Sequence, residues 1–181
     1  MKEAAKILFD EETDTEEIEA FLIALSEKGE TALEIAALAS VMKALANRVD
    51  VPDGPFMDNC GTGGDGSNSF NISTTTAFVL AGAGAKVAKH GNRKVSSAAG
   101  SSDLLEVLGI RLDFSPEETT ELLQEEGITF LYAPNVHPKM KRIGAVRQKI
   151  GKRTIFNLVG PLTNPVPLST QFAGISKTDF T

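Results

Sequence analysis

The sequence predicts an α/β protein with a small, all-helical N-terminal domain and a larger, mostly parallel α/β domain. Residues 1–48 carry apolar side chains at helical spacing. From residue 56 onward, short apolar segments alternate with helical ones, which is typical of a parallel sheet with right-handed crossovers. The residues between these regions include two prolines and a glycine. We therefore divide the chain into a helical domain (1–48), a linker (49–55) and an α/β domain (56–181).

Three helices are predicted in the N-terminal domain. Asp14 or Thr15 caps the second helix, and acidic residues follow in its first turn, where the helix dipole favours them. Thr31 and Glu34 have the spacing of a capping box for the third helix. Short amphipathic helices are stabilised mainly by packing. We therefore expect their spare apolar faces to pack on another part of the protein.

The first strand of the α/β domain, residues 56–60, leads into a glycine-rich turn. Four glycines between 61 and 66 allow a ligand to approach the backbone N–H groups closely. The capping residues Asn71, Ser73 and Thr74 then precede an apolar helical run, and a helix start attracts anions. Together these features indicate a phosphate or diphosphate site, where a hydroxyl can also bind Mg²⁺. The glycines alone are equally compatible with an ordinary tight turn.

A second strand is predicted to end at residues 87–88, and the segment Lys89-His90-Gly91-Asn92-Arg93 follows it at once. Open α/β sheets bind ligands at the carboxyl ends of their strands. Each of these residues alone would be an ordinary surface or packed residue, but five polar or glycine positions in a row are not expected in a core. Small polar residues at 96–97 and 100–101 lead into a helical run at 103–108. We expect this second polar helix entrance at the same edge.

The rest of the chain continues the alternation of strand and helix. The expected elements are a strand at 110–114, a helix that Ser115 caps and that ends near Gly127, a strand at 128–132 with an exit loop at 133–135, a basic amphipathic helix at 138–150, an apolar helix or strand at 154–162, and a strand at 172–175. Arg147 lies on the basic helix, where periodicity alone would make it a surface arginine.

Composition argues against several classes of protein. The net charge is −6, so no basic excess is available for a nucleic acid or an acidic membrane surface. No apolar run approaches the ~20 residues of a membrane span, and no signal-peptide pattern appears. The single cysteine, Cys60, excludes an internal disulfide and suits a reducing compartment, so we expect a cytoplasmic protein. Because Cys60 ends an apolar strand, we interpret it as a small hydrophobe rather than a nucleophile.

Four segments resemble the signature segments of the anthranilate phosphoribosyltransferase family. They are GTGGD at 61–65, NIST at 71–74, KHGNR at 89–93 and the long stretch at 137–165. KHGNR is the most specific of them. The resemblance implies transfer of a phosphoribosyl group from 5-phosphoribosyl 1-diphosphate (PRPP) to anthranilate in tryptophan biosynthesis, which yields N-(5-phosphoribosyl)anthranilate and diphosphate. It also implies a homodimer through the N-terminal helices, on which residues 154–165 pack as a helix.

The resemblance also implies the ligand-binding residues. For PRPP they are Gly61, Gly64, Asp65, Ser69, Asn71, Ile72, Ser73, Thr74, Lys89, His90, Gly91, Asn92, Arg93, Lys94, Val95, Ser96, Ser97 and Ser101. For anthranilate they are Gly61, His90, Asn92 and Arg147, whose guanidinium suits a carboxylate. Ser73 would ligate one Mg²⁺. No acid or base is assigned, because an aromatic amine is already a free nucleophile at neutral pH.

The chain departs from the family in two respects. Family members run to nearly twice this length, so we expect these 181 residues to be the N-terminal half of such a protein. The acidic Asp-Glu pair that binds Mg²⁺ in the family has no match before Thr181, and we expect the 181 residues alone to lack full activity. Ala98 and Ala99 stand where many members carry Lys-Ser, which removes one phosphate contact.

Two alternative functions remain open at this stage. A pyrimidine nucleoside phosphorylase shares the helical-plus-α/β architecture and a glycine-rich phosphate loop, although KHGNR and the stretch RTIFNLVGPL at 153–162 argue against it. The second alternative is a non-catalytic relative that keeps the fold and binds a phosphate ligand or a partner.

Overall fold

The computed structural model describes residues 1–51, 53–63, 70–93 and 100–175. The chain forms two compact units. The helical unit combines Met1–Ala46 with His137–Thr163, and the α/β unit combines Asn47–Val136 with Asn164–Thr181. The predicted fold class, a helical domain with a mostly parallel α/β domain, is confirmed. Compared with the expected division, residues 137–153 also lie in the helical unit, whereas residues 47–55 and 164–165 lie in the α/β unit.

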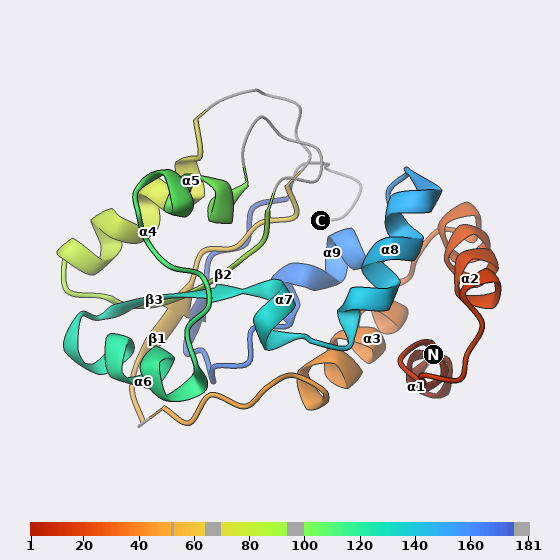
Figure 1. Ribbon diagram of the computed structural model, residues 1–181, viewed down its shortest axis with the longest axis horizontal. Helices are drawn as coiled ribbons and strands as arrows, with labels where there is room; N and C mark the ends of the chain where they lie inside the picture. The colour runs from red at the N-terminus through yellow and green to blue at the C-terminus, as the bar shows by residue number, and fades with distance from the viewer. Residues whose placement is uncertain (52, 64–69, 94–99, 176–181) are drawn as a thin grey trace. The chain divides into compact units, whose positions relative to one another are not determined.

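The helical unit consists of three N-terminal helices and a later helical segment (Figure 1). Its elements are α1 (Lys2–Leu8), α2 (Thr15–Lys28), α3 (Ala32–Ala44), α8 (Met140–Ile150), α9 (Phe156–Val159) and the 3₁₀ turn η1 (Gly160–Leu162). The predicted caps are present. Asp14 Oδ1 accepts a 2.8 Å hydrogen bond from Glu16 N, and Thr31 and Glu34 form the capping box. In the described part of the chain, no helix combines the length and the apolar character needed to cross a membrane.

The later segment supplies part of the apolar core of this unit. Ile143 and Val146 of α8 and Phe156 of α9 are buried in one cluster with residues of α1, α2 and α3. Polar contacts support the packing, since the Arg142 guanidinium donates to the carbonyls of Asp10 and Glu11. The apolar face of α8 thus covers the N-terminal helices, which explains why the helix belongs to this unit.

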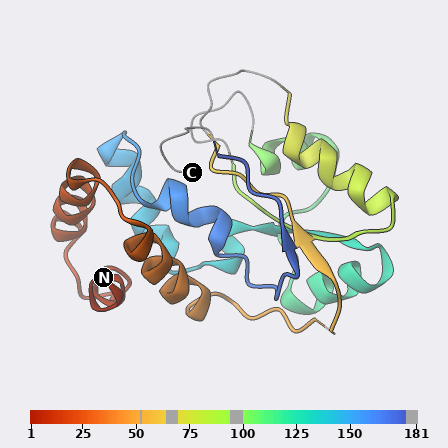
Figure 2. The ribbon, with the colours of Figure 1, turned by 180° about the vertical axis from the view of Figure 1, so that it is seen from behind.

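The α/β unit contains a four-stranded sheet in the order β3-β2-β1-β4, in which all pairs are parallel. The strands are β1 (Phe56–Asp58), β2 (Lys86–Gly91), β3 (Ile128–Tyr132) and β4 (Thr170–Gln171), and the helices are α4 (Ile72–Gly82), α5 (Ser101–Val107), α6 (Pro116–Glu125) and α7 (Ala133–Val136). Helix α6 covers one face of the sheet, and α4 and α5 cover the other (Figures 1 and 2). Because the strands are parallel, all four carboxyl ends lie at one edge.

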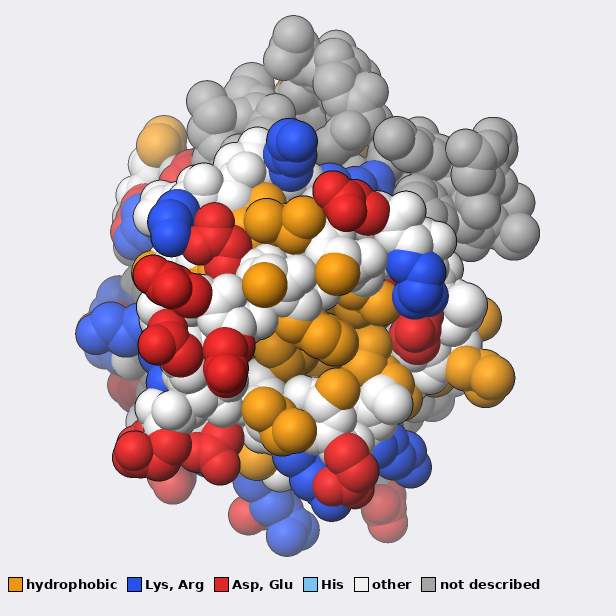
Figure 3. Space-filling model, turned by 90° about the vertical axis from the view of Figure 1, so that its right-hand side faces the viewer, with side chains coloured by type: hydrophobic (Ala, Val, Ile, Leu, Met, Phe, Trp, Pro, Cys, Tyr) orange, Lys and Arg blue, Asp and Glu red, His pale blue; other side chains and the backbone are white. Residues whose placement is uncertain are grey.

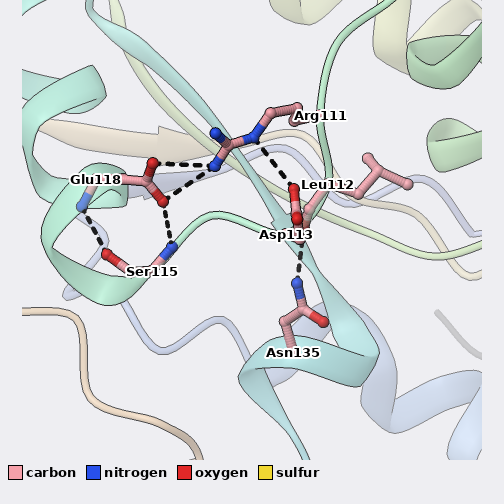
Figure 4. Close-up of polar contacts among 6 residues, drawn as sticks. All are labelled: Arg111, Leu112, Asp113, Ser115, Glu118 and Asn135. Atoms are coloured by element: carbon pink, nitrogen blue, oxygen red, sulfur yellow. Dashed lines mark hydrogen bonds and ion pairs between the residues drawn. The ribbon is translucent and has the colours of Figure 1, made fainter.

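The predicted strand at 110–114 is wrong, because this segment is a loop held by side chains (Figure 4). Asn135 Nδ2 donates a 2.7 Å hydrogen bond to the carbonyl of Leu112. The guanidinium of Arg111 pairs with Asp113 at 3.1 Å and with Glu118 at 2.9 Å. Asn135 thus satisfies the Leu112 carbonyl, and the two carboxylates balance the charge of Arg111. The segment is held by these contacts and not by pairing with a strand.

The predicted strand at 172–175 is also misplaced. The strand is β4, two residues earlier, and Phe172 N donates to the Asp58 carbonyl at 2.9 Å just beyond it. Phe172 and Ile175 are exposed, so their apolar character misled the sequence reading. The expected exit loop at 133–135 is the short helix α7, and the ambiguous segment at 154–162 is helical.

We predict that His137 makes the stability of the helical unit depend on pH. Its side chain is buried, and burial lowers its pKa to about 4 from 6.5. Protonation below pH 6.5 therefore favours the unfolded chain, and stability falls as the pH drops from 6.5 to 4. Relative to a His137→Gln variant, the wild type should lose about 3 kcal/mol of unfolding free energy between pH 7 and pH 4. Denaturant titrations at several pH values measure this difference, and equal pH dependence in both proteins would contradict the assignment.

Candidate functional site

The exits of β1 and β2 form the candidate site. Phe56 pairs with Lys86, and Met57 pairs with Val87, in parallel register. The segments that follow the two strands therefore leave the sheet at the same edge, as the sequence led us to expect. This is the edge at which open α/β sheets bind ligands.

The entrance of α4 is tied to the exit of β1. Asn71 caps the helix, since its Oδ1 accepts a 3.0 Å hydrogen bond from Thr74 N. The Ser73 hydroxyl donates to the same oxygen at 3.3 Å. Asn59, directly after β1, donates from Nδ2 to the Ser73 carbonyl at 2.6 Å. The N-terminus of α4 is thereby fixed beside the strand exit, where its dipole favours an anion.

Lys89 and His90 lie inside β2 and not in a loop after it. Both are buried, and only 2% of Lys89 is exposed. These two residues are therefore part of the core, contrary to the prediction that five polar or glycine positions in a row lie outside it. The ammonium of Lys89 carries three protons, but only one donates to a described residue, at 3.4 Å to the Asn59 carbonyl. A buried cation with so few protein partners suits an anionic ligand.

A carboxylate that the sequence reading passed over, Asp58, connects these parts. It is fully buried at the end of β1, and its Oδ1 accepts a 3.2 Å hydrogen bond from His90 N. Its Oδ2 accepts a 3.0 Å hydrogen bond from Asn164 Nδ2. Asn164 also donates to the Ala88 carbonyl at 2.7 Å and accepts from Val166 N at 2.9 Å. A charged residue within an apolar strand was the available signal for this network.

Burial and charge act in opposite directions on the ionisable groups here. Burial raises the pKa of Asp58, while the Asn164 hydrogen bond and the charge of Lys89 lower it. Burial lowers the pKa of Lys89, while its electrostatic interactions with Cys60 and Asp58 raise it. Burial also raises the pKa of the Cys60 thiol to about 12. The thiol is therefore protonated at neutral pH, which agrees with its interpretation as a small hydrophobe.

The remaining residues of the KHGNR segment connect β2 to α5. A Cβ on Gly91 would lie 2.7 Å from Ser101 Oγ, so only glycine allows Ser101 to approach the strand. The Arg93 guanidinium forms hydrogen bonds of 2.7 Å and 2.5 Å with Glu106 and one of 3.0 Å with Tyr132 Oη. Arg93 is thus anchored to α5 and β3. Asn92 is exposed at the strand exit, and its carbonyl accepts from Ser102 N at 3.3 Å.

Gly61 approaches the segment that follows β4. A Cβ on Gly61 would lie 2.9 Å from the backbone oxygen of Gly174. The same oxygen accepts a 2.9 Å hydrogen bond from Thr62 N. The glycine is therefore required by backbone contact at this edge, independently of any ligand.

Arg147 lies in the helical unit, on α8. It is half-buried, donates from Nη2 to Asn157 Oδ1 at 3.2 Å, and its guanidinium carbon lies 5.6 Å from the centre of the Phe156 ring. Burial lowers its pKa. Among the described residues, no carboxylate forms an ion pair with it, and its Nε has no hydrogen-bond partner. The guanidinium is therefore oriented by Asn157 and Phe156 and keeps donors for a carboxylate.

The described residues offer neutral oxygen ligands for a Mg²⁺ ion. Ser73 Oγ and Asn71 Oδ1 lie 3.3 Å apart at the start of α4. No group of three or more His, Cys, Asp or Glu side chains suited to a metal occurs in the part of the chain that the structure describes. Where Mg²⁺ binds together with a phosphate-bearing substrate, its ligands are a few protein oxygens, phosphate oxygens and water molecules. The Ser73 hydroxyl fits as one such ligand.

Seven of the predicted PRPP ligands lie outside the described residues. They are Gly64, Asp65, Ser69, Lys94, Val95, Ser96 and Ser97.

Comparisons with known proteins match nearly the whole chain. The family model described as "Glycosyl transferase family, helical bundle domain" matches residues 1–46, and that of the family's a/b domain matches residues 53–181. A curated anthranilate phosphoribosyltransferase of Exiguobacterium sibiricum is 61% identical over 179 residues, which cover 99% of this chain and 53% of the relative. The chain thus spans about half the length of the curated relatives it matches.

Two solved structures resemble the chain closely. The anthranilate phosphoribosyltransferase of Thermus thermophilus is 43% identical with a TM-score of 0.92, over 99% of this chain and 54% of that one. The Saccharomyces cerevisiae enzyme, solved in complex with PRPP and Mg, is 30% identical with a TM-score of 0.86, over 97% of this chain and 52% of that one. The resemblance found in the sequence is thereby confirmed.

We predict that Gly61→Ala displaces the segment after β4. The added Cβ would meet a backbone oxygen at 2.9 Å, so the variant should lose about 1–3 kcal/mol of unfolding free energy. Gly82→Ala is the matched control, because a Cβ there meets no atom within 4 Å and alanine favours the helix. Thermal or denaturant unfolding compares the two variants. A Gly61→Ala protein as stable as the Gly82→Ala protein would contradict the close contact.

Proposed function

Since the chain belongs to the glycosyl transferase family whose helical-bundle and α/β domain models it matches, we propose that it serves the transfer of a phosphoribosyl group from PRPP to anthranilate. The observation that carries the proposal is the buried Lys89 ammonium at the carboxyl edge of the sheet. It has one weak hydrogen bond to a described residue and lies beside the exit of β1 and the entrance of α4. A ligand with several phosphate groups would use its remaining donors.

The proposed PRPP site combines a charge with a helix entrance. Lys89 offsets the phosphate charge, and the N-terminus of α4 with Asn71 and Ser73 receives the diphosphate. When bound, Mg²⁺ would neutralise charge on the leaving diphosphate, with Ser73 as one ligand. Ser101, which lies against β2 at Gly91, is proposed as a contact of the phosphoribosyl group. The remaining predicted PRPP ligands stay predictions.

Arg147 is the proposed residue for the anthranilate carboxylate. Its guanidinium is oriented by Asn157 and by the Phe156 ring, and it has no carboxylate partner among the described residues. Two N–H groups of a guanidinium pair with the two oxygens of a carboxylate. Gly61, His90 and Asn92 are the anthranilate ligands that we predict on the α/β unit.

The proposed reaction is a substitution at C1 of the ribose. The bond from C1 to the diphosphate oxygen breaks, and the diphosphate leaves with the electron pair. The amine nitrogen of anthranilate forms the new bond to C1 and then releases a proton to water. Holding the two substrates in place supplies most of the rate acceleration, so the protein needs no strong general base. We place this reaction in tryptophan biosynthesis in the cytoplasm.

Two substitutions should separate the two substrates. Lys89→Ala should raise the KM for PRPP about tenfold or more and leave the KM for anthranilate nearly unchanged, because only PRPP carries phosphate. Arg147→Lys should do the reverse, because lysine keeps the charge and loses the paired donors. Both KM values are obtained from assays that follow anthranilate fluorescence, with the full product of the encoding reading frame as the enzyme.

The control for this experiment is Arg142→Lys. Arg142 lies on the same helix but donates to the carbonyls of Asp10 and Glu11, so neither KM should change. If Lys89→Ala and Arg147→Lys each raised both KM values equally, the two assignments would be wrong. Turnover of thymidine or uridine with free phosphate, and none of PRPP with anthranilate, would instead favour a nucleoside phosphorylase.

We also propose that the N-terminal helices form a homodimer interface. Figure 3 shows hydrophobic side chains gathered on the face formed by the right-hand side of Figure 1, where α1, α2 and α8 lie. Each N-terminal helix leaves one large apolar residue exposed: Ile7 on α1, Ile23 on α2 and Leu33 on α3. A contiguous exposed apolar patch is a feature of protein–protein interaction sites, and the patch on this face is the basis of the proposal.

Leu33→Lys should therefore shift the protein toward monomer. The residue is 84% exposed, so a lysine should fold normally and act only on an interface. Val107→Lys is the matched control, since Val107 is also 84% exposed but lies on the α/β unit. Sedimentation velocity over a range of concentrations measures the assembly state. A wild-type monomer, or equal effects of both variants, would contradict the proposed interface.

A further inference from the structure

Asn157, the second residue of α9, contacts the Arg147 guanidinium within the helical unit. It is half-buried, and its Oδ1 accepts two hydrogen bonds, from Arg147 Nη2 at 3.2 Å and from Thr154 N at 3.1 Å. Its backbone N donates to the Thr154 carbonyl at 2.9 Å. Two N–H groups face the side chain, so the amide oxygen points toward them and the amide nitrogen points away. The acceptor for Arg147 is therefore held in place by the turn that begins α9.

The guanidinium that Asn157 contacts is always charged, yet its partners in the described part of the chain are neutral. No Asp or Glu side chain there forms an ion pair with Arg147. Its Nε is buried and has no hydrogen-bond partner among the same residues. The ring of Phe156, whose centre lies 5.6 Å from the guanidinium carbon, is its other contact. The guanidinium is thus oriented by an amide and a ring, and neither neutralises its charge.

An aspartate at position 157 would bind the guanidinium more tightly than the asparagine does. Its side chain has nearly the same shape, and its oxygens could accept from the same two donors. Its hydrogen bond to Arg147 would join two opposite charges and would be roughly twice as strong as a neutral one. The carboxylate of a substrate would then have to displace that ion pair before it could bind. A neutral oxygen orients the guanidinium and leaves its charge for the ligand.

We propose that Asn157 is a positioning residue for the acceptor substrate: its neutral oxygen aims the Arg147 guanidinium, and the lack of charge at position 157 leaves the ion pair with Arg147 to the substrate carboxylate. The inference rests on the proposed function, because it concerns the affinity for anthranilate. It predicts that a substitution which keeps both hydrogen bonds and adds a charge impairs the use of anthranilate. A merely structural role for Asn157 would predict no such effect.

The first test is Asn157→Asp in the full product of the reading frame. The variant keeps an acceptor for Arg147 and Thr154, so its unfolding temperature should equal or exceed that of the wild type. Its KM for anthranilate should rise about tenfold or more, because the new ion pair must be broken, while kcat and the KM for PRPP stay nearly unchanged. Gln148→Glu is the matched control. It adds the same charge at the exposed position next to Arg147, and adjacent residues on a helix do not face each other, so neither KM should change.

The second test separates the contact with Arg147 from the contact with Thr154. Asn157→Ala removes the acceptor for both and should lower kcat/KM for anthranilate about fivefold. In an Arg147→Met background the same substitution should cause no further loss, because the group that Asn157 positions is absent. A role confined to the start of α9, through Thr154, would instead give the same loss in both backgrounds.

Three results would overturn the inference and leave the proposed function intact, provided that the wild type converts PRPP and anthranilate. They are an unchanged KM for anthranilate in Asn157→Asp, an equal rise of both KM values or a marked loss of stability in that variant, and an equal effect of Asn157→Ala in both backgrounds. Failure of the wild type to convert the two substrates would overturn the proposed function, and this inference with it.

Discussion

The parallel pairing of β1 with β2 is the constraint on which the candidate site depends. Parallel strands end at the same edge, so the backbone hydrogen bonds between β1 and β2 bring together the turn after β1 and the exit of β2. Asp58 and Asn164 then fix the two ends against each other. Two close backbone approaches complete the edge, because Gly61 meets Gly174 and Gly91 meets Ser101 with no room for a Cβ.

Local signals made much of the fold predictable. The caps at Asp14, Thr31 and Ser115 depend on residues within three positions of one another, and each is present as expected. The buried strand β3 was also read correctly from a short apolar run. In two other segments the same apolar signal gave a wrong prediction. The segment at 110–114 is held by the polar side chains of Arg111 and Asn135, and residues 172–175 follow the strand instead of forming it.

The candidate site was predictable in its location but not in its interior. Glycines and capping residues indicate a strand exit and a helix entrance by themselves, so the carboxyl edge of the sheet could be predicted as the site. The hydrogen bond between Asp58 and Asn164 joins residues 106 positions apart, and no spacing rule reveals it. The same holds for α8, whose apolar face has a helical period but no mark of its partner. Lys89 was expected on the surface because a charge without visible partners belongs there, and its partners come from segments distant in sequence.

The burial of Lys89 and Asp58 is better explained by ligand binding than by stability. Moving two charges out of water costs several kcal/mol each, and well-packed apolar residues of similar volume are often as stable as a buried ion pair. Here the pair does not even form a direct hydrogen bond, and burial shifts the pKa of each group toward its neutral form. A multiply charged phosphate ligand changes this balance, because its charge favours an ammonium whose desolvation cost folding has already met.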